Sequence, residues 1–290
     1  MLNIVVSLTV TKENINHIDK TIESIKNQTV KPNNIYLTIP DYSNNKYKRI
    51  QIPKKILNDK KIVIIKYKKD YKKLLNILGP LLMINDDNTI IITINKNIYS
   101  KYLVEDLINL HKKNPDSAIG YSGYIFGQYP YYYCKIEDNK NYFPFYSTKV
   151  RNENGMNVDV LNNDICILFK RSFFPKYEPF DELLKYSDID ETLQNINSNM
   201  LISGYLSKKN IKRIVFKNKR EIISNYLINN YNFITEFTNI YSAFHKLKKN
   251  GMFNDNLTCE KYYKTFTFFL FMSIIFIIFC ISTYISINRK

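Results

Sequence analysis

The feature that most constrains the fold is the alternation of short apolar runs with segments of helical periodicity along the chain. Runs rich in isoleucine, valine and threonine predict buried strands at 3–10, 33–39, 62–67, 89–94, 117–126 and 158–169. Isoleucines at helical spacing predict a helix over 12–28, and helices are also expected at 103–113, 200–209 and 219–249. Continuous apolar strands alternating with helices predict an α/β fold, in which a mostly parallel sheet carries helices on both faces.

A second constraint is residues 266–287, an apolar run without a charged side chain. At about 1.5 Å per residue, a helix of that length reaches roughly 33 Å, enough to cross a hydrocarbon core of about 30 Å. Tyrosine and lysine precede the run, and arginine and lysine follow it, as is typical of a membrane span. The alternative is a buried core helix, but a core helix of this length normally keeps a polar stripe. We therefore predict a C-terminal transmembrane helix.

This anchor sets the expected topology and domain organisation. The amino-terminal apolar run has no basic lead and no small-residue cleavage site, so we expect no signal peptide. The chain is then a tail-anchored, single-pass membrane protein whose soluble part is cytoplasmic. We predict an α/β domain over 1–215, a helical membrane-proximal segment over 216–265 and the anchor over 266–287. The four cysteines lie far apart, which argues against a disulfide framework or a zinc site.

The chain is strongly basic, with 42 Lys and Arg against 26 Asp and Glu and a formal net charge of +16. Such a balance is typical of proteins that bind nucleic acid, an anionic membrane or an anionic glycan. A compositional explanation competes with this one. The chain is rich in Lys, Asn, Ile and Tyr and poor in Gly and Trp, as the product of an AT-rich coding sequence, viral or otherwise, would be.

Two stretches concentrate the basic and aromatic residues. Lysines are densest over residues 46–73, and tyrosines gather over 121–133, where rings could stack on sugars or bases. The alternative is a solvated lysine surface and an ordinary aromatic core. No RNA-binding, helix-turn-helix or zinc pattern accompanies either stretch, which argues against specific recognition of nucleic acid.

Four longer stretches follow one another in a characteristic order and spacing. They are residues 5–40 (VVSLTVTKENINHIDKTIESIKNQTVKPNNIYLTIP), 70–126 (beginning DYKKLLNILGPLLMINDDNTIIITINKNIYSKYL), 158–174 (VDVLNNDICILFKRSFF) and 199–211 (NMLISGYLSKKNI). Over about residues 1–215, they resemble the GT-A glycosyltransferases of the family-2-like type, especially the short forms of large DNA viruses and bacteria. The resemblance implies a Rossmann-like nucleotide-diphospho-sugar transferase fold, a nucleotide-sugar donor, and Mg²⁺ or Mn²⁺ at the leaving diphosphate.

The chain departs from this family at the expected metal site. The family places a run of aspartates directly before an Ile-Tyr pair at the end of the fourth strand. The corresponding residues here are Asn95, Lys96 and Asn97, followed by Ile98 and Tyr99. Because amide oxygens are weak ligands and an ammonium group repels a cation, we expect no metal. Asp86 and Asp87 precede the strand by several residues, where Asp-Asp-Asn is ordinary turn chemistry.

The segment after the third strand departs in a similar way. The family's Asp-Tyr persists as Asp70 and Tyr71, but Lys72 and Lys73 replace the Gly-Pro that follows it. Asn76 stands where the family has a lysine. A second Gly-Pro pair, at residues 79–80, is retained.

The positions that lie near the sugar acceptor in the family also lack their acidic residues here. After VDVL the family carries Glu-Gly, where this chain has Asn162 and Asn163. The family's acidic pair before the ISGYL helix supplies the general base, and here it is Ser198 and Asn199, neither of which is a base near pH 7. Weak candidates for a substitute base lie about ten residues upstream, although a solvated helix start explains them as well. They are Asp188, Asp190 and Glu191.

These substitutions leave three hypotheses. The first is a degenerate glycosyltransferase that binds a nucleotide sugar, a glycan or a protein. The second is an active, metal-independent transferase that uses one of the upstream acids and a lysine cradle for the diphosphate. The third is a basic, membrane-bound interaction protein for anionic glycan or lipid. By the resemblance, the candidate substrate-binding residues are Thr9, Asp41, Asp70, Lys72, Lys73, Asn95, Lys96 and Asn97.

Overall fold

The computed structural model describes residues 2–11, 14–40, 50–126, 134–135, 141–142, 147–151, 155–163, 165–175, 198–218, 244, 246–253, 272–275 and 277. The chain divides into two compact units, one of residues 1–125 and 149–255 and one of residues 126–148 and 256–290. The described part of the second unit holds the antiparallel pair β7 (Cys134–Lys135) and β8 (Asn141–Tyr142) and a few helical residues at 272–275 and 277.

The predicted anchor lies almost entirely outside the described residues. Across the described ranges, no helix has the length and apolar character that crossing a membrane requires. The five described residues of the run, 272–275 and 277, are helical and exposed, and all but Ser273 are apolar. The anchor over 266–287 and the domain boundaries therefore stay predictions.

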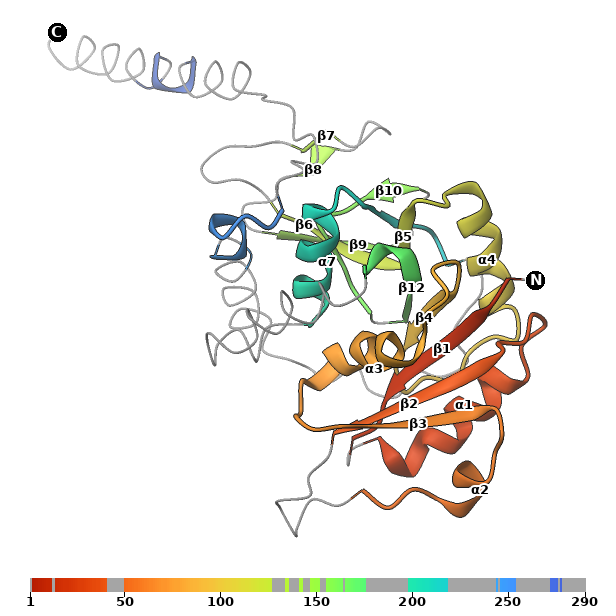
Figure 1. Ribbon diagram of the computed structural model, residues 1–290. Helices are drawn as coiled ribbons and strands as arrows, with labels where there is room; N and C mark the ends of the chain where they lie inside the picture. The colour runs from red at the N-terminus through yellow and green to blue at the C-terminus, as the bar shows by residue number, and fades with distance from the viewer. Residues whose placement is uncertain are drawn as a thin grey trace, which may run out of the picture. The chain divides into compact units, whose positions relative to one another are not determined.

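The first unit is built on an eight-stranded sheet with strand order β10-β13-β5-β12-β4-β1-β2-β3 (Figure 1). Its strands are β1 (Ile4–Thr9), β2 (Asn34–Pro40), β3 (Ile62–Tyr67), β4 (Ile90–Ile94), β5 (Ser117–Gly120), β10 (Met156–Asn157), β12 (Cys166–Lys170) and β13 (Lys212–Val215). The pairs β1–β2, β1–β4, β2–β3 and β5–β13 are parallel. The predicted α/β class with a mostly parallel sheet is confirmed.

Two predicted strands are wrong in extent. The run 117–126 is two strands, β5 and β6 (Ser122–Phe126), and the run 158–169 contains β11 (Val160–Leu161) and most of β12. β12 enters the main sheet antiparallel, between β4 and β5, while β11, β6 and β9 (Ser147–Arg151) form a second, three-stranded sheet. The run 117–126 stays buried through its break at Tyr121, so burial gives no sign of where the chain changes sheets. The break in the run 158–169 falls at the polar pair Asn162 and Asn163.

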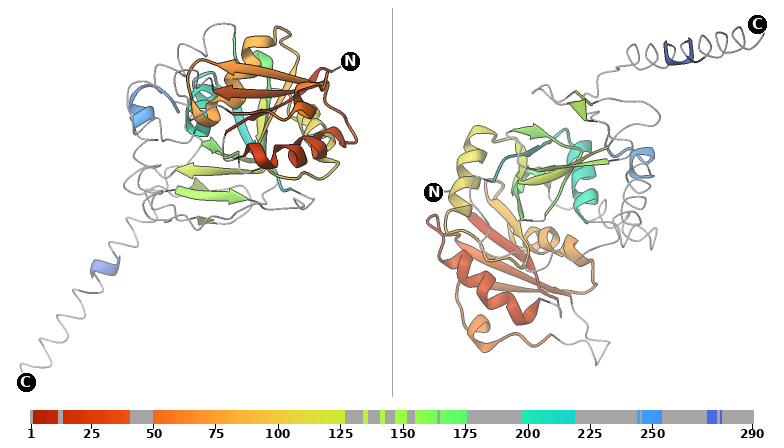
Figure 2. Two further views of the ribbon diagram at one scale, coloured as in Figure 1. Left: turned by 90° about the horizontal axis from the view of Figure 1, so that it is seen from below. Right: turned by 180° about the vertical axis from the view of Figure 1, so that it is seen from behind.

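Helices cover both faces of the main sheet, as predicted (Figures 1 and 2). The short helix η1 (Ile15–His17) leads into α1 (Ile18–Lys26), which shares one hydrophobic core with α4 (Leu103–Lys113) and β1, β2 and β4. On the other face lies α3 (Leu75–Met83), preceded by η2 (Lys72–Leu74). Helix α2 (Lys54–Leu57) precedes β3, η3 (Arg171–Phe173) follows β12, and α7 (Ser198–Lys208) packs against β11, β13 and η2.

Helix α3 packs very closely on the sheet because of its retained Gly-Pro pair. Gly79 and Pro80 lie inside the helix. A Cβ atom on Gly79 would lie 1.9 Å from Thr38 Oγ1, so only glycine allows α3 to approach β2 this closely. Hydroxyl side chains on the sheet beneath α3, including Ser7 and Thr9 on β1, leave room for that approach.

The segment before the second unit packs on the first. Residues 246–249 are helical, whereas 219–243 and 245, most of the predicted helix 219–249, lie outside the described residues. Met252 and Phe253 are buried against α7, where a Cβ atom on Gly204 would lie 2.8 Å from the sulfur of Met252. Leu247, Met252 and Phe253 of this segment are thus buried in the first unit.

Candidate functional site

The candidate site lies at the carboxyl ends of β1 and β4. Parallel neighbouring strands end at the same edge of a sheet, and open α/β sheets bind their ligands at that edge. Thr9 closes β1, and Asn95 directly follows β4. The departures from the family pattern near residues 72–76, 95–97, 162–163 and 198–199 meet here, although they are far apart in the sequence.

The first contact joins β1, α3 and β4. The hydroxyl of Thr9 donates a hydrogen bond to Asn76 Oδ1. Asn76 Nδ2 donates to the carbonyl of Ile94 at 3.3 Å, and the Asn76 side chain is buried. The residue in the place of the family's lysine is therefore a neutral brace between a helix and two strand ends.

The turn after β4 is held by a buried tyrosine. The Tyr99 hydroxyl accepts a hydrogen bond from the backbone N–H of Asn95 at 2.9 Å, and lies 2.9 Å from the carbonyl oxygens of Asn95 and Ile165. Burial raises the pKa of Tyr99 far above its usual range, so this hydroxyl stays protonated and neutral. The Asn95–Asn97 turn is thus held by hydrogen bonds of neutral groups.

A chain of carboxamides continues the site toward α7. Asn95 Nδ2 donates to the backbone carbonyl of Asn163, at the end of β11. Asn199 Nδ2, in the first turn of α7, donates to Asn162 Oδ1 at 3.3 Å. Asn162 Nδ2 in turn lies 3.4 Å from the hydroxyl of Tyr124 on β6. The side chains of Asn95, Asn162 and Asn199 are thus each hydrogen-bonded to a neighbouring group.

One acceptor in this network stays open. Asn162, Asn163 and Asn199 are all buried, and Asn163 Oδ1 has no hydrogen-bond partner among the described residues. A buried acceptor without a donor costs about 1–3 kcal/mol. A ligand that brings a hydroxyl or amide N–H to this atom would recover that cost.

The residues present do not fit the divalent cation of the family. Mg²⁺ and Mn²⁺ prefer hard, charged oxygen ligands. The turn after β4 offers the neutral oxygens of Asn95 and Asn97 and the half-exposed ammonium group of Lys96. Over the described residues, no group of three or more His, Cys, Asp and Glu side chains is placed to hold a metal ion.

The lysines that replace the Gly-Pro pair lie in a strained turn beside α7. Lys72 has a φ of 53°, in the left-handed region. Asp70 stabilises the turn, because its Oδ1 accepts from the backbone N–H of Lys72 at 2.8 Å and its Oδ2 lies 3.2 Å from Lys72 Nζ. Lys72 and Lys73 are exposed. They place positive charge at the same edge of the sheet as Lys96.

Several sequence-predicted residues cannot be placed. Asp41 and the three candidate bases, Asp188, Asp190 and Glu191, lie outside the described residues. The turn interpretation of Asp86 and Asp87 holds, because Asp86 Oδ1 accepts from the backbone N–H of Asn88 at 3.0 Å at the amino end of β4.

Sequence reasoning missed the groups that lock the site in place. They are Tyr124, Ser203, which accepts from the Leu161 N–H at 3.1 Å, and the hydroxyl of Tyr99. Of these three residues, only Tyr99 has a signal in the sequence, because it belongs to the Ile-Tyr pair.

Comparisons with known proteins find similarities in structure alone. No family model matches the sequence, and no curated protein does so either. A 4-diphosphocytidyl-2C-methyl-D-erythritol synthase from Anaerococcus prevotii is 13% identical with a TM-score of 0.45, over 85% of this chain and 96% of that one. A 2-C-methyl-D-erythritol 4-phosphate cytidylyltransferase from Francisella tularensis is 11% identical with a TM-score of 0.39, over 77% and 94%.

A third similar structure is a mannosyltransferase from Pyrobaculum calidifontis, determined with GDP-mannose and Mn²⁺. It is 8% identical with a TM-score of 0.49, and the match covers 86% of this chain and 64% of that one. Because all three TM-scores are below 0.5, these likenesses carry no conclusion about the function of this chain.

Proposed function

We propose that this protein is a GT-A-type, family-2-like glycosyltransferase scaffold that binds a sugar-bearing ligand without transferring the sugar. The observation that carries the proposal is the convergence of the altered motif positions at one edge of the sheet. Asn76, Asn95, Asn162 and Asn199 come from separate stretches and form hydrogen bonds within one site. A scaffold that keeps this geometry while losing its acids keeps a binding site and loses the chemistry.

The absence of two acidic groups accounts for the loss of sugar transfer. Without a carboxylate after β4, nothing there holds a divalent cation against a leaving diphosphate. Without an acid at 198–199, nothing there takes the proton of an attacking hydroxyl. The open acceptor of Asn163 and the amides around it instead suit the hydroxyl groups of a neutral sugar.

A metal-independent transferase is the second candidate, and Lys96 is the observation that favours it. Lys96 is half-exposed, and no carboxylate of the described residues lies within ion-pair distance of it. Its ammonium group, with those of Lys72 and Lys73, would neutralise a diphosphate without a metal. Asp188, Asp190 or Glu191 would then have to supply the base.

One assay separates the two candidates. The full chain, kept in neutral detergent micelles, is offered a panel of nucleotide sugars with and without Mn²⁺, and both transfer and hydrolysis are measured. We expect binding without turnover. Turnover that Asp190→Asn abolishes would favour the metal-independent transferase.

A metal-binding measurement directly tests whether the residues after β4 can ligate a metal ion. Titration of Mn²⁺ followed by electron paramagnetic resonance is expected to show no tight uptake by the wild type, with or without nucleotide sugar. The double variant Asn95→Asp/Asn97→Asp restores two carboxylates and is expected to gain Mn²⁺ binding. Tight uptake by the wild type only in the presence of nucleotide sugar would overturn the proposal.

The membrane anchor is part of the same proposal. The support for it is the charge-free run 266–287, and the expected location is a single-pass membrane protein with a cytoplasmic soluble part. Alkaline extraction of membranes from expressing cells should leave the full chain in the pellet and release a chain truncated after residue 265. Release of both, or sugar on Asn27, would contradict this topology.

A further inference from the structure

A dense group of lysines surrounds the edge strand β3, and the candidate functions above use only Lys72 and Lys73 of this group. Nine lysines lie between residues 54 and 73, on α2, on β3 and in the turns around them, and all nine are exposed. Only two carboxylates, Asp59 and Asp70, belong to the same stretch. We name this surface the β3 lysine edge.

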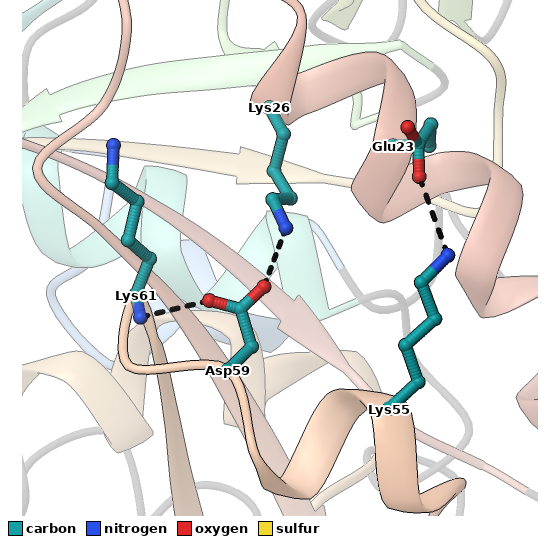
Figure 3. A network of polar contacts seen from close by, with 5 residues as sticks. All are labelled: Glu23, Lys26, Lys55, Asp59 and Lys61. Atoms are coloured by element: carbon teal, nitrogen blue, oxygen red, sulfur yellow. Dashed lines mark hydrogen bonds and ion pairs between the residues drawn. The ribbon is translucent and has the colours of Figure 1, made fainter.

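Neither carboxylate neutralises the edge as a whole. Asp59 Oδ2 lies 2.5 Å from Lys26 Nζ of α1, and this hydrogen-bonded partner lowers the pKa of Asp59 (Figure 3). Asp59 bonds Lys61 only through the backbone N–H, at 3.0 Å, while the Lys61 ammonium points away. Asp70 is engaged by Lys72 within its own turn.

The remaining ion pair of the region is weak and exposed. Lys55 Nζ lies 3.7 Å from Glu23 Oε2, with both side chains largely in solvent. Lys60, Lys66, Lys68 and Lys73 have no carboxylate of the described residues within ion-pair distance. The excess charge therefore lies in two groups, one before β3 and one at and beyond its carboxyl end.

The arrangement fits a linear polyanion. At about 3.3 Å per residue, β3 extends roughly 20 Å between the lysines of α2 and those after Tyr67. The two groups of lysines lie at the ends of one edge strand instead of covering a face, which suits an extended polyanion that spans both groups better than a flat bilayer. All of them are lysines, which act as point charges. They lack the planar guanidinium group with which arginine forms paired hydrogen bonds to phosphates and bases.

The aromatic residues of the edge argue against nucleic acid. Tyr67 and Tyr71 are half-buried and pack edge to face, with ring centroids 5.8 Å apart. Lys69 Nζ lies 5.1 Å from the centre of the Tyr71 ring. Rings occupied in this way present no open stacking platform for bases, which single-stranded nucleic-acid sites require.

We propose that the β3 lysine edge binds a linear sulfated or carboxylated glycan. Binding is electrostatic, needs no metal, and is separate from the amide site. The affinity should fall steeply with salt, because each neutralised anion releases a condensed counterion.

The test compares two variants of equal charge. Lys60, Lys66, Lys68 and Lys73 are each replaced by Gln in the edge variant, and Lys112, Lys113, Lys212 and Lys217 in the control. The control lysines are exposed and lie on α4 and beside β13, away from β3. Binding of the full chain in neutral detergent micelles to size-fractionated heparin is measured at several salt concentrations, with neutral dextran as the uncharged probe. Thermal melts verify that both variants fold.

The edge variant is expected to lose at least about tenfold in affinity, and its slope of log affinity against log salt should fall by about three. The control should stay within about threefold of the wild type. Equal losses in both variants, or unchanged binding in the edge variant, would overturn the assignment. Tighter edge-dependent binding to single-stranded RNA, or to mixed micelles containing phosphatidylserine, would replace the glycan with that partner.

Discussion

The two ends of strand β4 carry opposite side-chain chemistry. At the amino end, Asp86 and Asp87 are exposed, and Asp86 accepts hydrogen bonds from the backbone of Asn88 and from the hydroxyl of Thr89. At the carboxyl end, Asn95 joins a network of amides that is largely buried. A single short strand thus separates a charged, solvated turn from a neutral, internally bonded site.

This difference shows that the balance of acids and amides depends on position along the strand. A coding bias toward Asn and Lys would act on both ends alike, yet aspartates remain where they only shape a turn. At the carboxyl end, Asn95, Lys96 and Asn97 follow the strand instead. Because Asn and Asp side chains have nearly the same volume, exchanging one for the other at either end tests the effect of charge with little change in packing.

The largest effect is expected from placing a negative charge in the buried network. In Asn76→Asp, a carboxylate oxygen would face the carbonyl of Ile94, to which Asn76 Nδ2 now donates at 3.3 Å. We expect a loss of about 3 kcal/mol in the free energy of unfolding at pH 7. Burial raises the pKa of such an Asp, so the loss should shrink as the pH falls and the group takes up a proton.

Urea unfolding at pH 4.5 and pH 7.5 measures this effect. Asn88→Asp is the matched control, because it makes the same chemical change at the exposed amino end of β4. We expect the control to change the free energy of unfolding by less than about 0.5 kcal/mol at both pH values. Similar changes in the two variants would remove the distinction between the two ends.

The next effect concerns the helix that carries Asn76 to the carboxyl end. Gly79→Ala places a methyl group within 1.9 Å of Thr38 Oγ1, so α3 must move away from β2. A loss of about 2–3 kcal/mol is expected from this overpacking, measured by urea unfolding. Leu82→Ala on the same helix is the control, since Leu82 is exposed and should cost far less. Equal costs would show that α3 is not held tightly against β2.

A smaller effect is expected on the pH dependence of folding stability, and it arises at His111, outside the candidate site. Burial lowers the pKa of His111 on α4, with Lys170 adding to the shift and Asp116 opposing it. Because the unfolded chain binds the proton more readily, stability should fall as the pH drops through about 6.5 and below. His111→Gln should flatten this fall in thermal melts between pH 5 and pH 8. An unchanged slope would assign the fall to another group.

The smallest effect is expected at the amino end of β4. Asp86→Asn keeps an acceptor for the N–H of Asn88 and removes only an exposed charge. The free energy of unfolding should change by less than about 0.5 kcal/mol, and nucleotide-sugar or Mn²⁺ binding should not change. A measurable change in either binding would mean that Asp86 contributes to the site despite its place at the opposite end of β4.

Sequence patterns were enough for the elements with a single, clear period. The strands containing Val6, Leu37 and Ile92 were predicted within a residue or two, because each is buried on both faces and reads as an unbroken apolar run. The helix at Leu103–Lys113 was found at its observed bounds from its apolar stripe. The antiparallel entry of β12 was missed, because the direction of a strand leaves no mark on its hydrophobicity.

For the candidate site, the sequence identified the positions but not their contacts. Asn95, Asn162 and Asn199 were singled out by what they replace, each in its own stretch. That Asn199 donates to Asn162, and that Tyr99 fixes the turn after β4, depends on groups brought together across long separations in sequence. No local pattern records such pairs.

The order of amino acids by itself determined the α/β class, the charge excess along β3 and the absence of acids at the motif positions, because composition and periodicity are local properties. Only the tertiary structure decided that the replacing amides bond to one another and that the lysine edge keeps its charge. Both depend on which side chains meet when β1, β4, β11 and α7 pack, and on Lys26 of α1 reaching Asp59. Distance in space, which sets every hydrogen bond and ion pair, is fixed only by the folded chain.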